Sequence, residues 1–167
     1  MNSATRLRYT PDAMAPYNEK VILPLPAEKP WADIRIACGF GDHIPLALAD
    51  LQSNDHMLRI DALWAIDNEV IRQGNRYEGA AYIIKPLVDI LHRRSHGRDE
   101  AYGLLIEIAD GYDMPGATVE LVDGSVHPVH DVCRSELNRY RDQFEDDVLD
   151  KFVTYEAQEL LESLDEM

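Results

Sequence analysis

Residues 69–91 read EVIRQGNRYEGAAYIIKPLVDIL, and this stretch contains the end of one helix, a turn and most of the next helix. Gly74 suits the position just after a helix, where the backbone often adopts a left-handed conformation. Asn75 and Glu78 stand three residues apart, as in a capping box with Asn in the cap role. From Tyr77 onward the apolar residues recur at helical spacing and share one stripe. The stretch therefore predicts two packed helices joined by a tight turn.

Five residues of this stretch form a structural motif: Gln73, Gly74, Tyr77, Glu78 and Pro86. We expect Gln73 and Glu78 to satisfy backbone groups left open at the turn, and the Tyr77 ring to lie in the groove between the helices. Pro86 lacks a backbone N–H, so it should kink its helix near residues 82–85. The alternative for these residues is a direct role in function.

The helical period extends outward from this motif. Apolar stripes predict helices over residues 44–53, 55–73, 77–92 and 99–110. These four helices form two antiparallel pairs spaced roughly 35–40 residues apart, a period typical of two-helix solenoid repeats. Helical periodicity then returns towards the C-terminus, after a different pattern. There, Asp123-Gly124 between short apolar runs predicts a β-hairpin near residues 118–129.

The predicted fold is therefore all-α: a right-handed, HEAT-like helical-repeat stack of about six helices with one small β-hairpin. We expect a single domain over residues 1–167. Its parts are an irregular Pro-rich N-terminal arm (1–42), two helix pairs (43–111), a loop and hairpin (112–129) and acidic C-terminal helices (130–167).

The charge is unevenly distributed along the chain. There are 31 acidic and 16 basic residues, and residues 99–167 account for the whole net charge of −15. Such a surface repels phosphate and anionic lipid, which argues against nucleic-acid and membrane binding, and it attracts basic proteins. The N-terminus has no apolar core typical of a signal peptide. Two cysteines, Cys38 and Cys133, are too few for a disulfide framework, so we expect a cytoplasmic protein.

Together with residues 104–111, which read LLIEIADG, the motif resembles a bacterial group of small HEAT-repeat-like proteins. These proteins carry a Gln-Gly-x-x-Tyr turn between two helices and a proline midway along the second. The similarity spans about residues 44–145. Members often resemble immunity proteins encoded beside polymorphic toxins, including type VI secretion effectors. The resemblance implies an antitoxin-like protein that binds a cognate toxin, without catalysis and without a cofactor.

Carboxylates crowd the C-terminal helices, and six of them are candidates for partner binding: Asp142, Glu145, Asp146, Asp147, Asp150 and Glu156. Like charges four residues apart destabilise a helix, so stability alone does not favour this accumulation. We predict a docking surface for a basic partner; the alternative is a solvated outer face. Tyr140, Phe144 and Tyr155 could anchor the partner, or else pack in the core.

Two groups of histidines invite a metal-site interpretation. His127, His130, Asp131 and Cys133 include zinc-ligand types, and the His-Asp pair is found in some metal-dependent phosphohydrolases. The alternative is a hairpin-to-helix junction with incidental histidines. His92 and His96 could share a helical face, but we expect them to interact as cations with a helix C-terminus.

The sequence therefore predicts an immunity protein that sterically blocks a basic toxin domain. The alternatives are a general protein-binding scaffold, a metal-dependent hydrolase and immunity by enzymatic reversal of a toxin's modification. The oligomeric state is left open.

Overall fold

A computed structural model describes residues 22–94 and 96–167, so residues 1–21 of the expected N-terminal arm lie outside the described part. Seven α-helices occur in the described ranges: α1 (Ile44–Asp50), α2 (His56–Val70), α3 (Glu78–Arg93), α4 (Arg98–Asp110), α5 (Val129–Arg139), α6 (Arg141–Asp147) and α7 (Thr154–Glu166). Short 3-10 helices cover Trp31–Asp33 and Arg72–Gly74. The prediction of a helical fold is confirmed. The C-terminal part holds three helices rather than two, because the chain bends at Tyr140 between α5 and α6.

Six short strands form three two-stranded pairs in the described residues. Antiparallel β1 (Arg35–Ile36) and β2 (Gly39–Phe40) precede α1, while β3 (Asn75–Arg76) pairs in parallel with β4 (Tyr112–Asp113). The predicted hairpin is present as β5 (Thr118–Glu120) and β6 (Val126–Pro128). Residues 25–27 of the arm add to this hairpin through Ala27 N–H to Glu120 O and Val122 N–H to Leu25 O.

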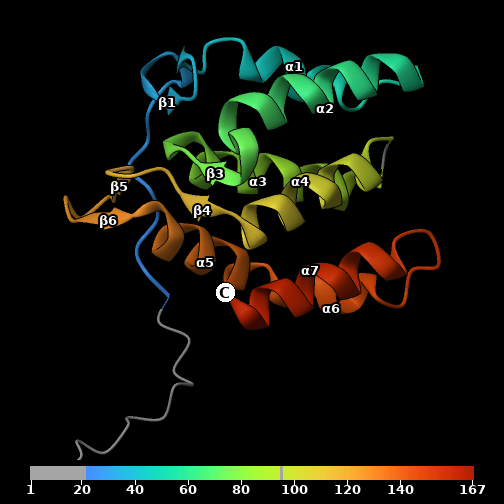
Figure 1. Ribbon diagram of the computed structural model, residues 1–167. Coiled ribbons are helices and arrows are strands. Elements are labelled where there is room, and N and C mark those ends of the chain that lie inside the picture. The colour runs from blue at the N-terminus through green and yellow to red at the C-terminus, as the bar shows by residue number, and fades with distance from the viewer. Residues whose placement is uncertain (1–21, 95) are drawn as a thin grey trace, which may run out of the picture.

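The helices stack in order along the molecule (Figure 1). α1 packs on α2 and α3 packs on α4, as the sequence predicted for two helix pairs. α4 lies between α2 and α7, whereas α3 packs against α5. The short strands gather at one end of the helices, and the loops after α3 and α6 lie at the opposite end (Figure 1).

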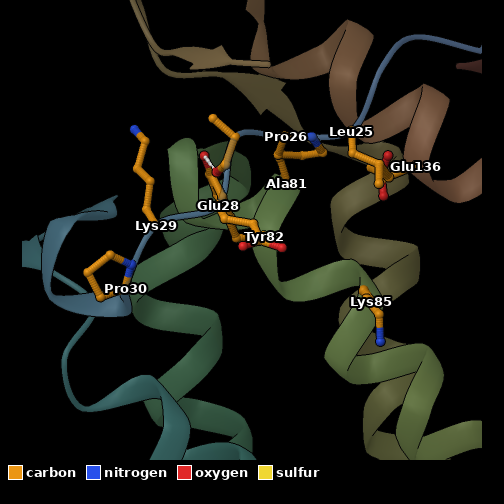
Figure 2. Close-up of a pocket in the computed structure, with 10 residues that line it drawn as sticks. Leu25, Pro26, Glu28, Lys29, Pro30, Ala81, Tyr82, Lys85 and Glu136 are labelled. Atoms are coloured by element: carbon orange, nitrogen blue, oxygen red, sulfur yellow. Dashed lines mark hydrogen bonds between the residues drawn. The ribbon is translucent and has the colours of Figure 1, made fainter. Parts of the chain in front are cut away.

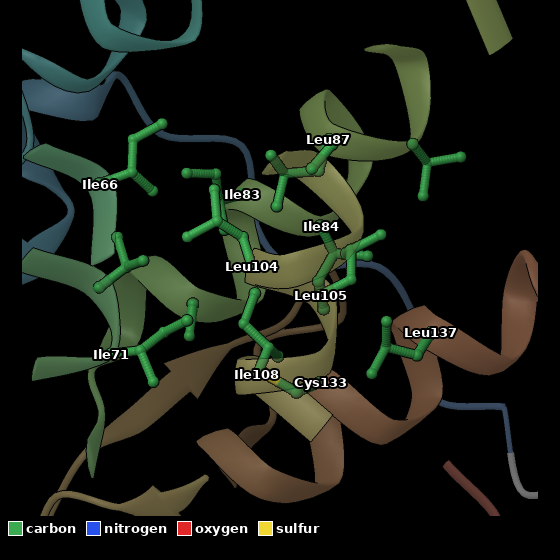
Figure 3. Close-up of a cluster of buried hydrophobic side chains, with 14 of the residues drawn as sticks. Ile66, Ile71, Ile83, Ile84, Leu87, Leu104, Leu105, Ile108, Cys133 and Leu137 are labelled. Atoms are coloured by element: carbon green, nitrogen blue, oxygen red, sulfur yellow. The ribbon is translucent and has the colours of Figure 1, made fainter. Parts of the chain in front are cut away.

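A continuous apolar core runs between these helices (Figure 3). Its centre is formed by Ile83, Ile84 and Leu87 of α3 with Leu104, Leu105 and Ile108 of α4, all almost completely buried. Full burial of such a side chain contributes about 1.5–3 kcal/mol. Cys133 and Leu137 of α5 extend the same core. The α3–α4 pair thus contacts both α2 and α5.

The face that α2 buries differs from the predicted stripe. Ala62, Ile66 and Val70 enter the core, whereas Met57 is 64% exposed and Trp64 is 56% exposed. Apolar spacing alone predicts one stripe for this helix, made of Met57, Ile60, Leu63, Trp64, Val70 and Ile71, because α2 has apolar residues on more than one face. The sequence offers Asn54 or Asp55 as the cap of this helix, and Asp55 is the cap, since its carboxylate accepts hydrogen bonds from the N–H groups of Met57 and Leu58.

The turn at Gln73–Glu78 is tight, but its capping arrangement differs from the prediction. Gln73 (φ 55°) and Gly74 (φ 76°) both have left-handed backbone conformations. Asn75 lies in β3, and Tyr77 is the N-cap of α3 without a side-chain capping bond. The predicted capping box is therefore wrong.

Two further residues of the motif have their own positions in the fold. The buried Glu78 carboxylate pairs with Lys29 and accepts a hydrogen bond of 2.9 Å from the Arg35 N–H, so it holds the N-terminal arm instead of capping the turn. Pro86 lies inside α3, which runs without a break from Glu78 to Arg93. The missing N–H of Pro86 thus does not end the helix.

The buried Arg76 side chain joins four segments. Its Nε donates to Asp113 Oδ1 at 2.9 Å, its Nη1 donates to the Ile108 carbonyl at 2.8 Å, and its Nη2 lies 3.1 Å from His130 Nδ1. Asp113 Oδ2 in turn accepts the His130 backbone N–H at 2.8 Å. Arg76 therefore satisfies the C-terminal end of α4 while Asp113 caps the N-terminal end of α5.

We expect Arg76→Met to destabilise the protein by about 3–5 kcal/mol, because it leaves Asp113 without its buried cation and the α4 carbonyl without a donor. Chemical denaturation followed by circular dichroism measures this loss. Arg72→Met is the matched control, since Arg72 is exposed four residues earlier, and it should change the free energy of unfolding by about 0.5 kcal/mol or less. Similar effects of the two substitutions would contradict the role given to Arg76.

Candidate functional site

The six candidate carboxylates of the C-terminal helices occupy three kinds of environment. Asp142, Glu145 and Asp146 are exposed on α6. Asp150 and Glu156 are partly buried, and Asp147 is only 2% exposed. The exposed group is available to a partner, whereas Asp147 belongs to the interior.

Asp147 is buried and therefore does not belong to the predicted docking surface. Its Oδ2 accepts the Tyr102 hydroxyl at 2.7 Å, its Oδ1 accepts Gln143 Nε2 at 3.0 Å, and Arg98 Nη2 lies 3.5 Å away. These groups together compensate a buried negative charge. Burial and the hydrogen bond to Asp147 raise the pKa of Tyr102, so its hydroxyl stays protonated.

The aromatic neighbours of the acidic residues also divide between core and surface. Phe144 is buried and packs edge-on against Tyr102, with ring centroids 6.2 Å apart. Tyr155 is exposed at the start of α7. Of the three proposed anchors, Tyr155 is thus fully open to a partner, Phe144 is a core residue, and Tyr140 is half-buried.

A second group of carboxylates spans α2, α4 and α7, and we call it the acidic face: Asp67, Asp99, Glu107, Asp110 and Glu156. Burial, followed by the charges of Asp67 and Asp110, raises the pKa of Glu107. Burial, followed by the charges of Glu156 and Glu100, raises the pKa of Asp99. Like charges on neighbouring helices therefore lie close enough to repel one another.

The sequence analysis missed most of the acidic face. Asp99, Glu107 and Asp110 lie in the segment that holds the excess charge, but they are dispersed along an amphipathic helix. Asp67 belongs to the balanced N-terminal half and lies near Glu107 only because α2 packs beside α4. No salt bridge is formed by Asp67, Glu107 or Asp110 within the described residues, so their repulsion is not locally compensated.

The residues of the suggested metal site do not converge. His127 lies beside the Ser125 hydroxyl, and His130 uses Nδ1 as an acceptor from Arg76. Cys133 is fully buried in the apolar core, which raises the pKa of its thiol and disfavours the thiolate that a metal requires. Asp131 is exposed on the surface. Across residues 22–94 and 96–167, no three His, Cys, Asp or Glu side chains are grouped so as to hold a metal ion.

The two histidines near the end of α3 also lie apart in role. His92 Nδ1 is 3.1 Å from the Val88 carbonyl, within the last turns of the helix. His96 lies in the following loop and lines a surface cavity with Arg94 and Arg98. The expected interaction with a helix C-terminus therefore fits the position of His92.

A cavity of about 690 Å³ lies between the N-terminal arm and helices α3 and α5 (Figure 2). Its polar groups are engaged within the fold: Tyr82 donates its hydroxyl to the Ala27 carbonyl, and Glu136 pairs with Arg139. Burial raises the pKa of Tyr82 to about 12 and also raises the pKa of Glu136. Tyr82 and Arg139, which donate to the Ala27 and Leu23 carbonyls, hold the arm in place.

Comparison with known proteins adds no relative to this description. No protein-family model matches the chain, and searches of curated proteins and of solved structures likewise find no match. Among the described helices, none combines the length and the apolar character that crossing a bilayer requires.

We expect Asp147→Asn to destabilise the fold by about 2 kcal/mol, because a neutral amide replaces the buried charge that faces Arg98 and Tyr102. Asp146→Asn is the matched control on the exposed neighbour and should alter stability by about 0.5 kcal/mol or less. Thermal and chemical denaturation of both variants measures the difference. Equal stability of the two variants would contradict the structural role given to the buried Asp147.

Neutralising Asp67 and Glu107 should stabilise the protein, because burial raises the pKa of both carboxyl groups and the charges of Asp67 and Asp110 raise that of Glu107 further. A carboxyl group whose pKa is raised by folding destabilises the native state when ionised, above the raised pKa, and this penalty disappears as the pH falls below the ordinary pKa. We expect Asp67→Asn/Glu107→Gln to gain about 0.5 kcal/mol at neutral pH, a value limited by solvent screening, and nothing at acidic pH. Asp61→Asn, an exposed α2 control, should show no such pH-dependent gain. A gain that persists at low pH would contradict the electrostatic explanation.

Proposed function

We propose that this chain is an immunity protein that binds a basic toxin domain and sterically blocks it. The observation that carries the proposal is a group of carboxylates: Asp67, Glu107 and Asp110, which form no salt bridge within the described residues, together with exposed Asp142, Glu145 and Asp146 on α6. A cationic partner would relieve their mutual repulsion as well as gain attraction. Such a partner would also be drawn in by the long-range field of the net charge of −15.

The same proposal interprets the helical stack as HEAT-like. Successive helix pairs α1–α2 and α3–α4, followed by α5 with α6 and α7, each pack on the next. Helices α2, α4 and α7 form one layer of this stack, and the acidic face lies along it. An extended helical layer is the surface through which solenoid proteins commonly hold other proteins.

Neutralisation by occlusion uses no chemistry from this chain. The engaged state of Tyr82, Glu136 and His130 favours a binding role over catalysis, and it gives no support to the metal-dependent hydrolase. A general protein-binding scaffold remains the second candidate function. The specific observation favouring it is a separate exposed apolar group on α1 and α2, which consists of Leu46, Met57 and Trp64.

The experiment is co-expression with the protein encoded next to this chain's gene, followed by purification and titration. We expect that neighbour to arrest growth alone, and we expect one equivalent of this chain to abolish its activity. Protection at far lower ratios would instead indicate enzymatic reversal. A harmless neighbour, or one that this chain fails to bind, would contradict the proposal.

Charge reversal tests the surface itself. Asp99→Lys/Glu107→Lys/Asp110→Lys should weaken toxin binding by at least about tenfold, equivalent to about 1.4 kcal/mol, and flatten its salt dependence. Calorimetry at low and high salt measures both effects.

The matched control is Glu28→Lys/Asp33→Lys/Asp42→Lys, which changes the net charge equally but at exposed sites of the N-terminal part. Reversal of Asp142, Glu145 and Asp146 tests α6 in the same way. If the control weakens binding as much as the α4 variant, net charge rather than the acidic face is responsible.

A further inference from the structure

Three large apolar side chains project from the segment after α6 and from the first turn of α7. Leu149 is 87% exposed, Phe152 is 72% exposed and Tyr155 is 82% exposed, and we call this group the apolar tip. They are separated by regular three-residue intervals, and Leu149 and Phe152 line one cavity of about 570 Å³. Aromatic side chains such as Phe152 and Tyr155 are enriched at protein interfaces.

The segment that presents the apolar tip is firmly held. Asp150 pairs with Arg98 Nη1 at 2.9 Å, and its other carboxylate oxygen accepts the Phe152 N–H at 3.0 Å. Its backbone carbonyl accepts the Val153 N–H and the Thr154 hydroxyl. Val153, which lies between Phe152 and Tyr155 in the sequence, is buried in the apolar core and so holds the segment against the helices. Ordering before binding reduces the entropy lost when a partner is bound.

These contacts give structural roles to Asp150 and Asp147, two of the six candidate carboxylates. The Phe152 N–H and the Arg98 guanidinium hold the pKa of Asp150 below its usual range, so Asp150 stays ionised as the anchor. Asp147, on the same arginine, fixes the end of α6. Both residues are thus positioning residues for the apolar tip.

The charged residues around the apolar tip favour a partner of positive charge. Asp146 shares the 570 Å³ cavity with Leu149 and Phe152, and Asp99 shares a second cavity of about 320 Å³ with Phe152. Asp142 and Glu145 precede the tip on α6, and Glu156 follows Tyr155 directly. The two cavities are also lined by four cations, Arg59, Arg94, Arg98 and Lys151, so their lining carries both signs. Arg59 pairs with Glu100, and Arg98 pairs with Asp147 and Asp150, so the negative sign beside the tip comes from the exposed carboxylates of α6 and from Glu156. A basic polypeptide with an apolar depression is complementary to this arrangement.

We propose that the apolar tip is the main anchor of the docking surface and inserts into an apolar depression ringed by basic residues on the partner. This inference rests on the proposed function, since it names where and how the toxin is held. Carboxylates guide the partner in, and the apolar contacts then slow its dissociation.

Two synthetic peptides of equal positive charge test the inference without the toxin: an amphipathic Leu/Lys helix and a Ser/Lys peptide. We expect the Leu/Lys peptide to bind the full chain at least about tenfold more tightly, and we expect Leu149→Ser/Phe152→Ser/Tyr155→Ser to remove that advantage. The matched control, Leu46→Ser/Met57→Ser/Trp64→Ser, removes exposed apolar groups from α1 and α2 and should keep it. Fluorescence anisotropy measures binding, and circular dichroism verifies that both variants are folded.

The inference is overturned if the Leu/Lys peptide has no advantage on the unaltered chain, or if its advantage survives loss of the apolar tip. The toxin titration separates this failure from that of the proposed function. Neutralisation that the tip variant retains would leave immunity standing and reject the anchor. The opposite result is a peptide preference that depends on the tip while the protein encoded next to this chain's gene is harmless. That result would retain the anchor and reject immunity.

Discussion

The buried ion pair between Arg76 and Asp113 is the interaction on which the arrangement of the stack depends. It lies where β3 and β4 run side by side, so it joins the turn before α3 to the turn after α4. Arg76 also closes the C-terminal end of α4, and Asp113 caps α5. Gly111 makes this close approach possible, because a Cβ there would lie about 3.1 Å from the Gly74 carbonyl oxygen. One cation thus fixes the position of α5 relative to the central pair.

Buried ion pairs recur wherever distant segments meet. Glu78 fastens the N-terminal arm to α3, and Arg98 fastens the segment after α6 to the start of α4. Of the C-terminal cations, Arg139 pairs with Glu136 of its own helix and donates to the Leu23 carbonyl of the arm, while Arg141 pairs with Glu145 of its own helix and with exposed Asp165 of α7. The basic side chains are therefore committed largely to holding the fold. The acidic face is left without them, which concentrates the chain's excess negative charge on the surface.

Periodicity predicted the helices and the hairpin because both depend on local spacing and turn chemistry. It could not assign the outer face of α2, since Met57, Trp64, Ile66 and Val70 are all apolar and only the neighbouring helices decide which are covered. The capping box failed for a related reason. Glu78 has the right spacing from Asn75, but the arm supplies a cation and an N–H from residues more than forty positions away. Tertiary partners replaced the local one.

The candidate site shows the same limit for charged residues. Nothing in the run from Asp142 to Asp150 distinguishes Asp147 from Asp146, yet one is buried against Arg98 and the other is exposed. The difference follows from helix geometry together with the position of a cation nearly fifty residues earlier. Likewise, Asp67 and Glu107 become neighbours only through helix packing. Sequence reasoning could therefore predict that the C-terminal part is acidic, but not which carboxylates form a surface.

An exposed apolar tip would ordinarily favour self-association. Here the excess charge opposes it, because two copies that approach through their C-terminal parts bring like charges together. A basic partner meets the opposite situation: the carboxylates that keep copies apart attract it, and the apolar tip is exposed when it arrives. In the proposed complex, the two requirements of selective binding fall to different groups. Charge would decide which partner can approach, and the side chains held in place by the Arg98–Asp150 pair would decide how slowly it dissociates.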